Sequence, residues 1–446
     1  MAVVYHVADG EREWLKPVKA SYPILVSGLL VGGVLGFSSA YHMKRRSPDD
    51  KIVLVDRLGG PGQGNIAKSE GAFRNVFTSK TNFLLADSTI DAFTHFQHDL
   101  GYDLNLDHIG YLWLFNEEQH RRLKPVLDSM ARLGVELRFF DEGLSHMIPG
   151  LVTEFTGAEA EILGLEPVDV AMQGVKCGSI DADSLVRCYE RMFIEAGGEV
   201  VYGAEAKRLL LEPKEGLGIP GEPFVWQNAA VKGADTSKGE IRAGTTVVAA
   251  GVWSERLLDP IGIDAMMRPK KRHIFVFKDP RLRGLFEVEG LNEYGALPLT
   301  VLPKSGVYLK AEVSEGSIWV GCADNLGRCF GLEDDPQPEE GYYTEGIYHV
   351  LVEYFPCFKD VRPVNMWAGQ YAINSFDGIP VVAPAPGMIY VGAASGSGIM
   401  KCDALGRIAA ALYMGEDEAE LYGGRRFTVA DLGVRSRRVE REEFII

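Results

Sequence analysis

The first strong hydrophobic pattern of the chain lies near its N-terminus. Residues 24–31 form a continuous apolar run, residues 32–36 are rich in glycine, and residues 37–46 continue as a helical segment. A second apolar run follows at residues 51–56 and ends on an acid. This order predicts a buried parallel strand, a tight turn, a helix and a second buried strand.

The uncharged stretch 20–43 also has a competing interpretation as a membrane-spanning helix. It is long enough to cross a bilayer, and Gly28, Gly32 and Gly36 have the GxxxG spacing of membrane helix dimers. The second strand argues against this, because its final acid, Asp56, lies 20 residues after Gly36. An acid at that distance is typical of the carboxylate that holds the ribose of a dinucleotide. We therefore favour nucleotide binding and keep a membrane anchor as the alternative.

The glycine motif departs from the dinucleotide pattern at one position. With Gly33 and Gly36 as the second and third glycines of G-x-G-x-x-G, the first position falls on Val31. The first glycine permits the tight turn, and the second lets a pyrophosphate approach backbone N–H groups. Val31 should strain or reshape this turn unless Gly32 replaces the missing glycine. Cofactor affinity is the property that this departure affects.

Later segments alternate between strand and helix patterns and then change character. Helices are predicted at 81–96 and 119–133 and from a cap at Asp181 or Asp183 to Ala196, and buried strands at 111–115, 199–202, 245–251 and 388–392. The polar, glycine-rich residues 216–243 indicate an excursion or hairpin. Residues 265–365 contain short alternating strands, such as 273–277, 307–310 and 317–321, which predict an antiparallel sheet.

These patterns predict an α/β fold class with two domains. A Rossmann-like cofactor domain is assembled from discontinuous segments, at 22–85, 173–262 and 366–430. An antiparallel-sheet substrate domain comprises 86–172 and 263–365, and residues 431–446 form a C-terminal tail.

Composition narrows the function classes. The net charge of −16 argues against binding to nucleic acid as the main role. The six cysteines include no CxxC pair, so we expect neither a disulfide framework nor a metal site. Glycine makes up 51 of 446 residues, above the typical content of about 7%, which indicates close approaches between backbone and ligand. Low asparagine and glutamine content is a thermophile trend.

The N-terminal segment also bears on location. The apolar run begins after 19 residues of mixed charge and lacks a clear cleavage site, so no signal peptide is expected. We predict a cytoplasmic protein, peripheral to the inner face of the membrane if its electrons go to a quinone. A homo-oligomer is compatible with the sequence.

The C-terminal glycine turn indicates which dinucleotide is bound. A strand at 388–392 runs through the turn at 396–398 into a helix, so free N–H groups and the positive end of the helix dipole face the ligand. A flavin needs such donors near N1 and O2, where negative charge develops on reduction, whereas a nicotinamide does not. This favours FAD over NAD.

Several motifs together resemble the D-amino-acid oxidase superfamily of FAD-dependent amine oxidoreductases, which includes sarcosine and glycine oxidases. They are GFSSAYH, IVLVDR, the loop ending in GAFR, GSIDADSLV, TTVVAAGVWS, WAGQYAINSFDGIPVV and GAASGSGIMKCD. The motif RPKKR at 268–272, DNLGR at 324–328, the following LEDDPQPEEGYY, and ELYGG at 420–424 resemble the archaeal dye-linked L-proline dehydrogenases more closely.

This resemblance implies a non-covalent FAD and oxidation of L-proline to 1-pyrroline-5-carboxylate, with electrons leaving to a dye- or quinone-like acceptor that the sequence does not identify. One alternative is oxidation of sarcosine, glycine or a D-amino acid by an enzyme of the same superfamily. Another is a flavin-less or membrane-anchored binding protein on the same fold. The substrate would be a small-molecule amino acid in either enzyme interpretation.

The resemblance also implies the site residues. Arg74 falls where relatives place an arginine on the carboxylate or flavin side, Lys401 matches the lysine that closes their flavin motif, and Tyr371 is the third predicted catalytic residue. The structural alternatives are an ion pair for Arg74, a surface position for Lys401 and core packing for Tyr371. Predicted cofactor contacts are Gly33, Gly36, Asp56, Arg57, Lys68, Ser69, Ala72, Ala206, Ala250, Gly251, Trp253, Gly369, Gly396, Ser397, Gly398, Ile399, Met400 and Lys401.

Overall fold

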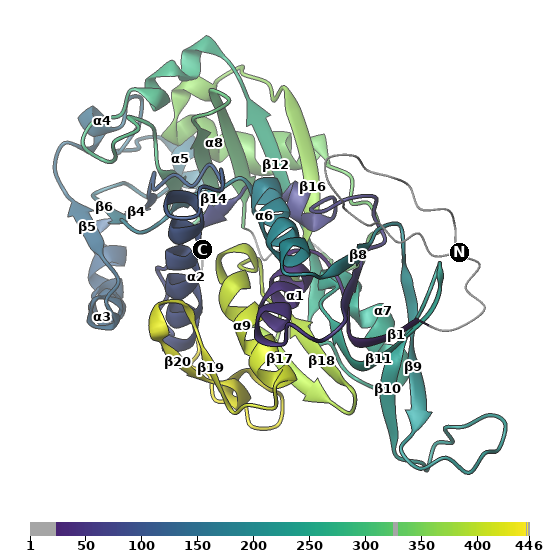
Figure 1. Ribbon diagram of the computed structural model, residues 1–446. Helices are drawn as coiled ribbons and strands as arrows, with labels where there is room; N and C mark the ends of the chain where they lie inside the picture. Colours follow the sequence, from purple (N-terminus) through teal and green to yellow (C-terminus); the bar gives the residue numbers. More distant parts are fainter. Residues whose placement is uncertain (1–23, 324–328, 443, 445–446) are drawn as a thin grey trace.

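The structure is a computed structural model that describes residues 24–323, 329–442 and 444. Figure 1 shows two large sheets, with helices packed against the lower one and the tail ending between them. Three features of the sequence interpretation lie outside the described residues: the predicted domain start at residue 22, the motif at 324–328, and residues 443, 445 and 446 of the tail.

The first sheet has the parallel core predicted for a dinucleotide-binding domain. Its strands are β1 (Ile24–Val31), β2 (Ile52–Val55), β8 (Glu199–Val201), β9 (Ala206–Pro213), β10 (Ala229–Thr236), β11 (Gly239–Val248), β17 (Val381–Ala385) and β18 (Met388–Gly392). The order is β17-β18-β11-β1-β2-β8, with β18 through β8 parallel. β10 pairs with β11 and β9 with β10, both antiparallel, which gives the hairpin predicted for residues 216–243.

The register of this sheet fixes the position of the site. Val31 pairs with both Val55 and Val248, so β1, β2 and β11 end together at one edge. The glycine turn directly follows β1, Asp56 directly follows β2, and Ala250 lies two residues after β11, so these residues lie side by side. Ligands of open parallel sheets bind at such an edge.

Three helices cover one face of the first sheet: α1 (Val34–Arg46), α6 (Ala182–Glu195) and α9 (Cys402–Tyr413). Of the two predicted caps, Asp181 is the one that caps α6, by accepting hydrogen bonds from the N–H groups of Asp183 and Ser184. α1 and α9 approach closely because Gly406 leaves room for Ser38, and the Ser38 hydroxyl donates to the Cys402 carbonyl at 2.8 Å. This packing holds the starts of both helices against the same sheet edge.

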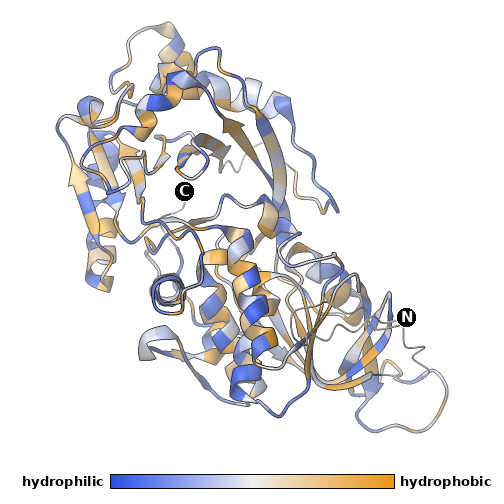
Figure 2. Cartoon of the chain, turned by 45° about the horizontal axis from the view of Figure 1, so that its top comes forward, coloured by the Kyte–Doolittle hydropathy of each residue, from blue (hydrophilic) through white to orange (hydrophobic). Residues whose placement is uncertain are grey.

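The second sheet is mainly antiparallel. Its strands are β4 (Tyr111–Phe115), β5 (Leu137–Phe140), β6 (Val170–Gly174), β12 (Arg268–Phe277), β13 (Leu299–Val301), β14 (Val307–Glu312), β15 (Ser317–Cys322) and β16 (Asn365–Ile373). The order is β16-β12-β15-β14-β13-β4-β6-β5, and the β13–β4 pair is parallel. Figure 2 shows hydrophobic residues along the strands and mixed residues along the helices.

Further helices and two pairs of short strands lie outside the two large sheets. The remaining helices are α2 (Lys80–His98), α3 (Glu117–Leu133), α4 (Leu144–Met147), α5 (Ala158–Leu163), α7 (Ser254–Leu258) and α8 (Tyr348–Tyr354). The remaining strands pair as β3 (Ala72–Phe73) with β7 (Gly178–Ser179) and as β19 (Glu418–Glu420) with β20 (Arg426–Thr428).

The proposed division into domains can be compared with the two sheets. The segments assigned to each domain contain the strands of the matching sheet, with two differences. β6 of the second sheet extends two residues beyond the assigned boundary at 172. β16 falls in a segment assigned to the cofactor domain, yet it pairs with β12 of the second sheet along its whole length. The division itself remains a proposal.

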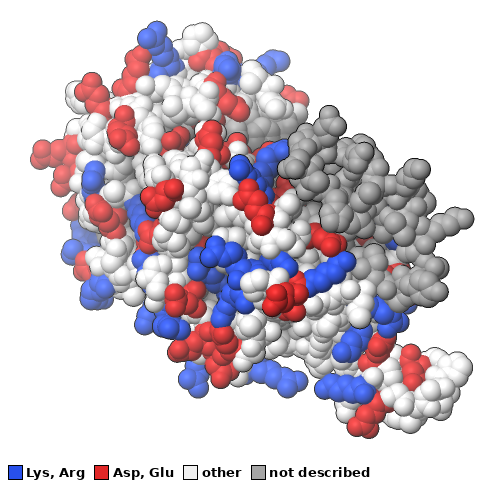
Figure 3. All heavy atoms as spheres, viewed as in Figure 1, with Lys and Arg blue, Asp and Glu red and all other residues white. Residues whose placement is uncertain are grey.

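The structure does not support the interpretation of residues 20–43 as one membrane helix. The described part of that stretch is strand β1 followed by helix α1, and Gly28 lies within the strand. Among the described residues, no helix is both long enough and apolar enough to span a bilayer. On the face shown in Figure 3, acidic and basic side chains are interspersed.

Candidate active site

The glycine turn after β1 borders a cavity at the edge of the first sheet, here called the first cavity. Gly32 has a φ of +138°, and a Cβ added to it would lie 2.0 Å from the Ala249 carbonyl oxygen. Gly32 therefore replaces the missing first glycine of the motif, while Val31 stays buried in the strand. No side chain caps α1 at Gly33, and an added Cβ there would meet none of the described atoms within 4 Å. The helix N-terminus thus presents N–H groups to open space that suits a phosphate.

The role of Gly32 leads to a prediction for Val31→Gly. Restoring the glycine of the motif should not tighten FAD binding, because Gly32 already makes the turn. It should instead destabilise the protein by about 1–3 kcal/mol, since a buried valine side chain is lost and a strand glycine is introduced. Flavin titration and denaturant unfolding of the two proteins measure both effects. A tenfold gain in FAD affinity would show that Val31 does limit the site.

The acid after β2 lies at the other side of the first cavity. Asp56 Oδ1 accepts a hydrogen bond from the Leu58 N–H at 2.9 Å, and burial raises the pKa of Asp56. The Arg57 guanidinium carbon lies 4.1 Å from the centre of the Trp253 ring. Asp334 binds both residues, at 3.4 Å from Arg57 Nη1 and 3.2 Å from Trp253 Nε1. This acid belongs to the segment LEDDPQPEEGYY, for which the sequence predicted no contact with Arg57 or Trp253.

Close backbone contacts shape the wall between the first cavity and the second sheet. A Cβ on Gly369 would lie 2.8 Å from the Lys68 Cβ, so the loop before β3 can rest directly on β16. The Trp367 indole donates to the Lys68 carbonyl at 3.0 Å, and Gln370 N–H donates to Asn65 Oδ1 at 3.0 Å. β16 is therefore part of the cavity wall.

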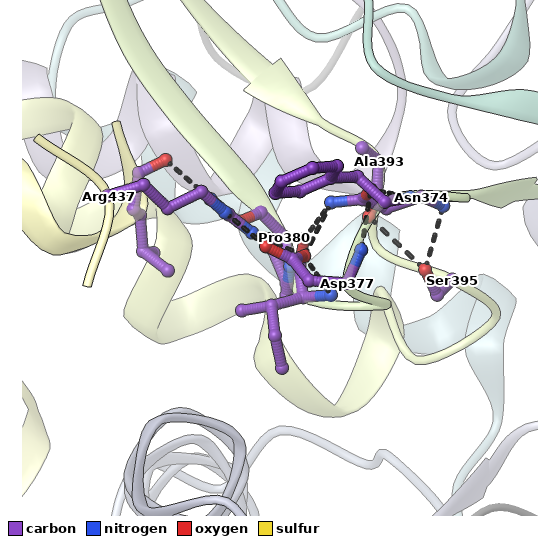
Figure 4. Close-up of polar contacts among 9 residues, drawn as sticks. Asn374, Asp377, Pro380, Ala393, Ser395 and Arg437 are labelled. Carbon is purple, nitrogen blue, oxygen red and sulfur yellow. Dashed lines mark hydrogen bonds and ion pairs between the residues drawn. The ribbon is translucent and has the colours of Figure 1, made fainter. Parts of the chain in front are cut away.

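The C-terminal glycine turn closes the cavity from the side of α9. Ala393, Ser395 and Gly396 all have positive φ, and a Cβ on Gly396 would lie 2.4 Å from the Tyr371 ring. The Ser395 hydroxyl accepts from the Asn374 N–H at 2.9 Å, and Asn374 Nδ2 donates to Asp377 Oδ1 at 2.9 Å. Figure 4 shows this connection continuing to Arg437 of the tail. Hydrogen bonds from neighbouring segments thus hold the strained turn in place.

A second cavity adjoins the first, and two of the predicted catalytic residues meet there with a third at the boundary. Arg74 and Lys401 line the second cavity, and Tyr371 lines both. The Arg74 guanidinium carbon lies 4.2 Å from the centre of the Phe77 ring, and Lys401 Nζ lies 4.6 Å from it. Both cations are buried, so Lys401 does not have the surface position of the alternative interpretation.

Lys401 is held by neutral partners. Its ammonium group donates to Asn82 Oδ1 and to Ser397 Oγ, each at 2.7 Å. Burial, and then the nearby charge of Arg74, lower the pKa of Lys401 to about 7, while Glu442 opposes this shift. Burial also lowers the pKa of Arg74, yet a guanidinium remains charged. Among the described residues, no carboxylate bonds directly to either cation. The second cavity therefore holds a cationic pair, the arrangement that an anionic ligand group requires.

The C-terminal tail forms part of the wall of the second cavity. Glu442 accepts hydrogen bonds from the Thr78 N–H at 2.8 Å and from Asn82 Nδ2 at 3.2 Å, next to the start of α2. Arg437 donates to Asp377 Oδ1 at 2.8 Å and to the Ile379 carbonyl at 2.9 Å. Val434, Arg435, Arg437, Val439, Arg441 and Glu442 all line the cavity.

The structure brings nearly all of the predicted cofactor residues to these two cavities. Gly33, Asp56, Arg57, Lys68, Ser69, Ala206, Ala250, Gly251, Trp253, Gly369, Gly396, Gly398 and Ile399 line the first. Ala72, Ser397, Met400 and Lys401 line the second. Gly36 lines neither and instead lets α1 pack on β2, with Leu54 Cδ1 3.6 Å from the position of an added Cβ.

Sequence reasoning missed several residues that line the cavities. A basic run such as Lys270–Arg272 is typical of solvated or interdomain ion pairs, and Lys271 does pair with Glu333 and Glu339. Arg272 is instead buried and lines both cavities. The sequence did contain a signal that Arg272 differs from Lys271. Lys270 and Arg272 are two positions apart on one strand and so share a face, opposite to that of Lys271. Glu70 and the tail residues carried no comparable signal.

The chemistry of the first cavity fits a flavin dinucleotide. It combines an uncapped helix N-terminus at Gly33, a carboxylate after the second strand at Asp56, and a second glycine turn before α9. These groups suit, in turn, a pyrophosphate, a ribose and an isoalloxazine edge.

Comparison with known proteins agrees with this description. The model of the family described as FAD dependent oxidoreductase, DAO, matches residues 32–412. FAD-dependent oxidoreductase domain-containing protein 1 of Xenopus laevis is 23% identical over 419 residues, which cover 85% of this chain and 77% of that protein. The chain belongs to the DAO family of FAD-dependent oxidoreductases, and FAD is its cofactor.

Solved structures share the fold. L-proline dehydrogenase from P. horikoshii has a TM-score of 0.71 at 19% identity, covering 89% of this chain and 95% of that one. Glycine oxidase from Geobacillus kaustophilus has a TM-score of 0.68 at 18% identity, covering 88% and 95%. At these identities the similarity establishes the Rossmann-like domain and the substrate-side sheet.

Proposed function

We propose that this chain is an FAD-dependent dehydrogenase of amino acids whose substrate is L-proline. It oxidises the C–N bond to give 1-pyrroline-5-carboxylate, holds FAD without a covalent bond, and passes electrons to an acceptor other than oxygen. The observation that carries the proposal is the buried pair of cations, Arg74 and Lys401, in a cavity that adjoins the FAD cavity. We place the enzyme in the cytoplasm, at the inner membrane face if a quinone is the acceptor.

Three residues that line the second cavity can each bind a different part of the substrate. Arg74 offers a planar guanidinium that can bind a carboxylate through two hydrogen bonds, and Lys401 adds a second charge. Tyr371 lies at the boundary of the cavities, where it can fix the substrate ring against the cofactor. FAD, when bound, supplies the acceptor for the hydride that leaves the carbon next to nitrogen.

Lys401 gives the affinity for carboxylates a defined pH dependence. Because the pKa of this ammonium is lowered to about 7, raising the pH through 7 removes its charge in the free enzyme. We expect the Kd of tetrahydro-2-furoate, a carboxylate without an amine, to increase about tenfold between pH 6 and pH 8.5. Lys401→Met should bind weakly and without this dependence. A flat profile for the wild-type protein would exclude Lys401 as a carboxylate ligand.

A substrate panel tests the proposed function. The flavin-loaded protein is assayed with L-proline, sarcosine, glycine and D-amino acids, each with a dye acceptor and with oxygen. L-proline with the dye should give the highest kcat/KM, and oxygen should be a poor acceptor. Faster turnover of glycine, sarcosine or a D-amino acid, or efficient use of oxygen, would replace the proposal with the amine oxidase alternative.

A further inference from the structure

Glu70 is an enclosed acid that none of the roles above uses. It lies between Ser69 and Gly71 and lines both cavities. The residue as a whole is partly exposed because it borders the cavities, whereas its Oε2 atom is out of contact with solvent. Oε2 has no hydrogen-bond partner among the described residues. A buried carboxylate oxygen without a hydrogen bond destabilises the folded protein, so it calls for a functional explanation.

The groups around Glu70 come from three strands. The tyrosines Tyr308 on β14, Tyr111 on β4 and Tyr371 on β16 lie close enough to the Glu70 carboxyl for its charge to affect them. Lys310 on β14 is a nearby cation. Burial raises the pKa of Glu70, whereas Lys310 and then Tyr308 lower it.

Lys310 is already engaged elsewhere. Its ammonium group donates to the Glu70 backbone carbonyl, to Ser179 Oγ at 2.9 Å and to Glu312 Oε2 at 3.0 Å. It therefore binds the Glu70 main chain and neutralises Glu312, and it does not pair directly with the Glu70 carboxylate. The Glu70 carboxylate remains available to a ligand, since the residue lines both cavities.

The second cavity thus carries charges of opposite sign on one chain segment. Arg74 and Glu70 are four residues apart, on either side of β3, and Lys401 stands with Arg74. An α-amino acid matches this arrangement, because it is a zwitterion with the carboxylate next to the ammonium. A 2-hydroxy acid has the same carboxylate but offers no positive charge and no acidic proton near pH 7.

We propose that Glu70 is the proton acceptor for the substrate ammonium. One ammonium N–H bond breaks and its proton passes to the Glu70 carboxylate. The nitrogen keeps the electron pair of that bond and becomes a neutral amine, the form from which hydride can leave the adjacent carbon. The inference rests on the proposed function and names the residue that distinguishes an amino acid from a 2-hydroxy acid.

The first test compares flavin reduction in the wild-type protein and Glu70→Gln. Anaerobic reduction by L-proline is followed by stopped flow across pH. Loss of the proton acceptor should slow reduction by about 100-fold at neutral pH, because proton transfer typically contributes 10²–10⁴. The wild-type rate should level off at alkaline pH, whereas the variant's rate should keep rising as free amine accumulates in solution.

A matched control separates this role from a structural one. Glu312→Gln removes a carboxylate that also contacts Lys310 but lines neither cavity, and it should leave the rate and its pH profile within threefold of wild type. Tetrahydro-2-furoate, measured by the flavin difference spectrum, should bind Glu70→Gln within threefold of the wild-type Kd. A Glu70→Gln protein that is reduced at the wild-type rate with the wild-type pH profile would overturn the proposal.

Ligand binding separates this inference from the proposed function. If no amino acid reduces the wild-type flavin, the proposed function fails, and the role of Glu70 is tested by binding affinities alone. The ratio of the Kd of tetrahydro-2-furoate to the Kd of L-proline should then be at least tenfold lower in Glu70→Gln than in the wild-type protein. An unchanged preference would overturn it.

Discussion

Arg74→Ala is expected to raise the KM for an amino acid by well over tenfold while the protein keeps its flavin. The guanidinium is buried in the second cavity and lies over the Phe77 ring, where it faces no directly bonded carboxylate among the described residues. A charge-assisted hydrogen bond contributes roughly 1.5–3 kcal/mol, and about 1.4 kcal/mol corresponds to a factor of ten. Steady-state kinetics with a dye acceptor measure the change.

Two variants make this result specific. Arg74→Lys keeps the charge but not the planar pair of donors, so its KM should lie between those of the wild-type protein and Arg74→Ala. Arg187→Ala removes an exposed arginine on α6 that pairs with Asp183, and it should change KM by less than twofold. An unchanged KM in Arg74→Ala with retained flavin would leave Arg74 as a structural residue and exclude it from the substrate site.

Gly32→Ala is expected to lower the stability of the protein, whereas Gly33→Ala is expected to lower its affinity for FAD. A methyl group on Gly32 would lie 2.0 Å from the Ala249 carbonyl oxygen, on a residue with φ of +138°. The backbone at the end of β1 or β11 must then move, and we expect a loss of about 3 kcal/mol or more of unfolding free energy. A methyl group on Gly33 meets none of the described atoms within 4 Å.

Gly33→Ala should therefore fold with nearly wild-type stability and lose FAD affinity by at least tenfold, since the methyl group occupies the space where a pyrophosphate approaches the N–H groups of α1. Denaturant unfolding of the flavin-free proteins and flavin titration measure the two effects separately. Wild-type FAD affinity in Gly33→Ala would place the pyrophosphate elsewhere.

The sequence predicted local elements well where the hydrophobic period was clear. Strands were expected at 24–31, 111–115 and 388–392, and β1, β4 and β18 have those bounds. The sequence also allowed the prediction that Gly32 replaces the missing motif glycine, because a glycine next to the motif position can make the same turn. The residues that follow the strands were predicted as a group because parallel strands end at a common edge.

The rest depended on pairing between distant segments. β16 looked like part of the cofactor domain, since its motif precedes the C-terminal flavin turn, and only its pairing with β12 places it in the second sheet. Glu70 gained its environment from Tyr308 and Tyr111, which lie on strands far away in the chain. Arg437 and Glu442 of the tail contact residues near 377 and 78. Side-chain periodicity reports burial, but it does not report which distant segment supplies the partner.

The central claim is that an amino acid bound in the second cavity reduces the FAD in the first. The most direct measurement is anaerobic titration of the purified yellow protein with L-proline while the oxidised flavin absorbance is recorded. Full bleaching by L-proline, with none caused by tetrahydro-2-furoate, is the predicted result. A flavin spectrum that stays oxidised with L-proline and every other amino acid of the panel would contradict the claim.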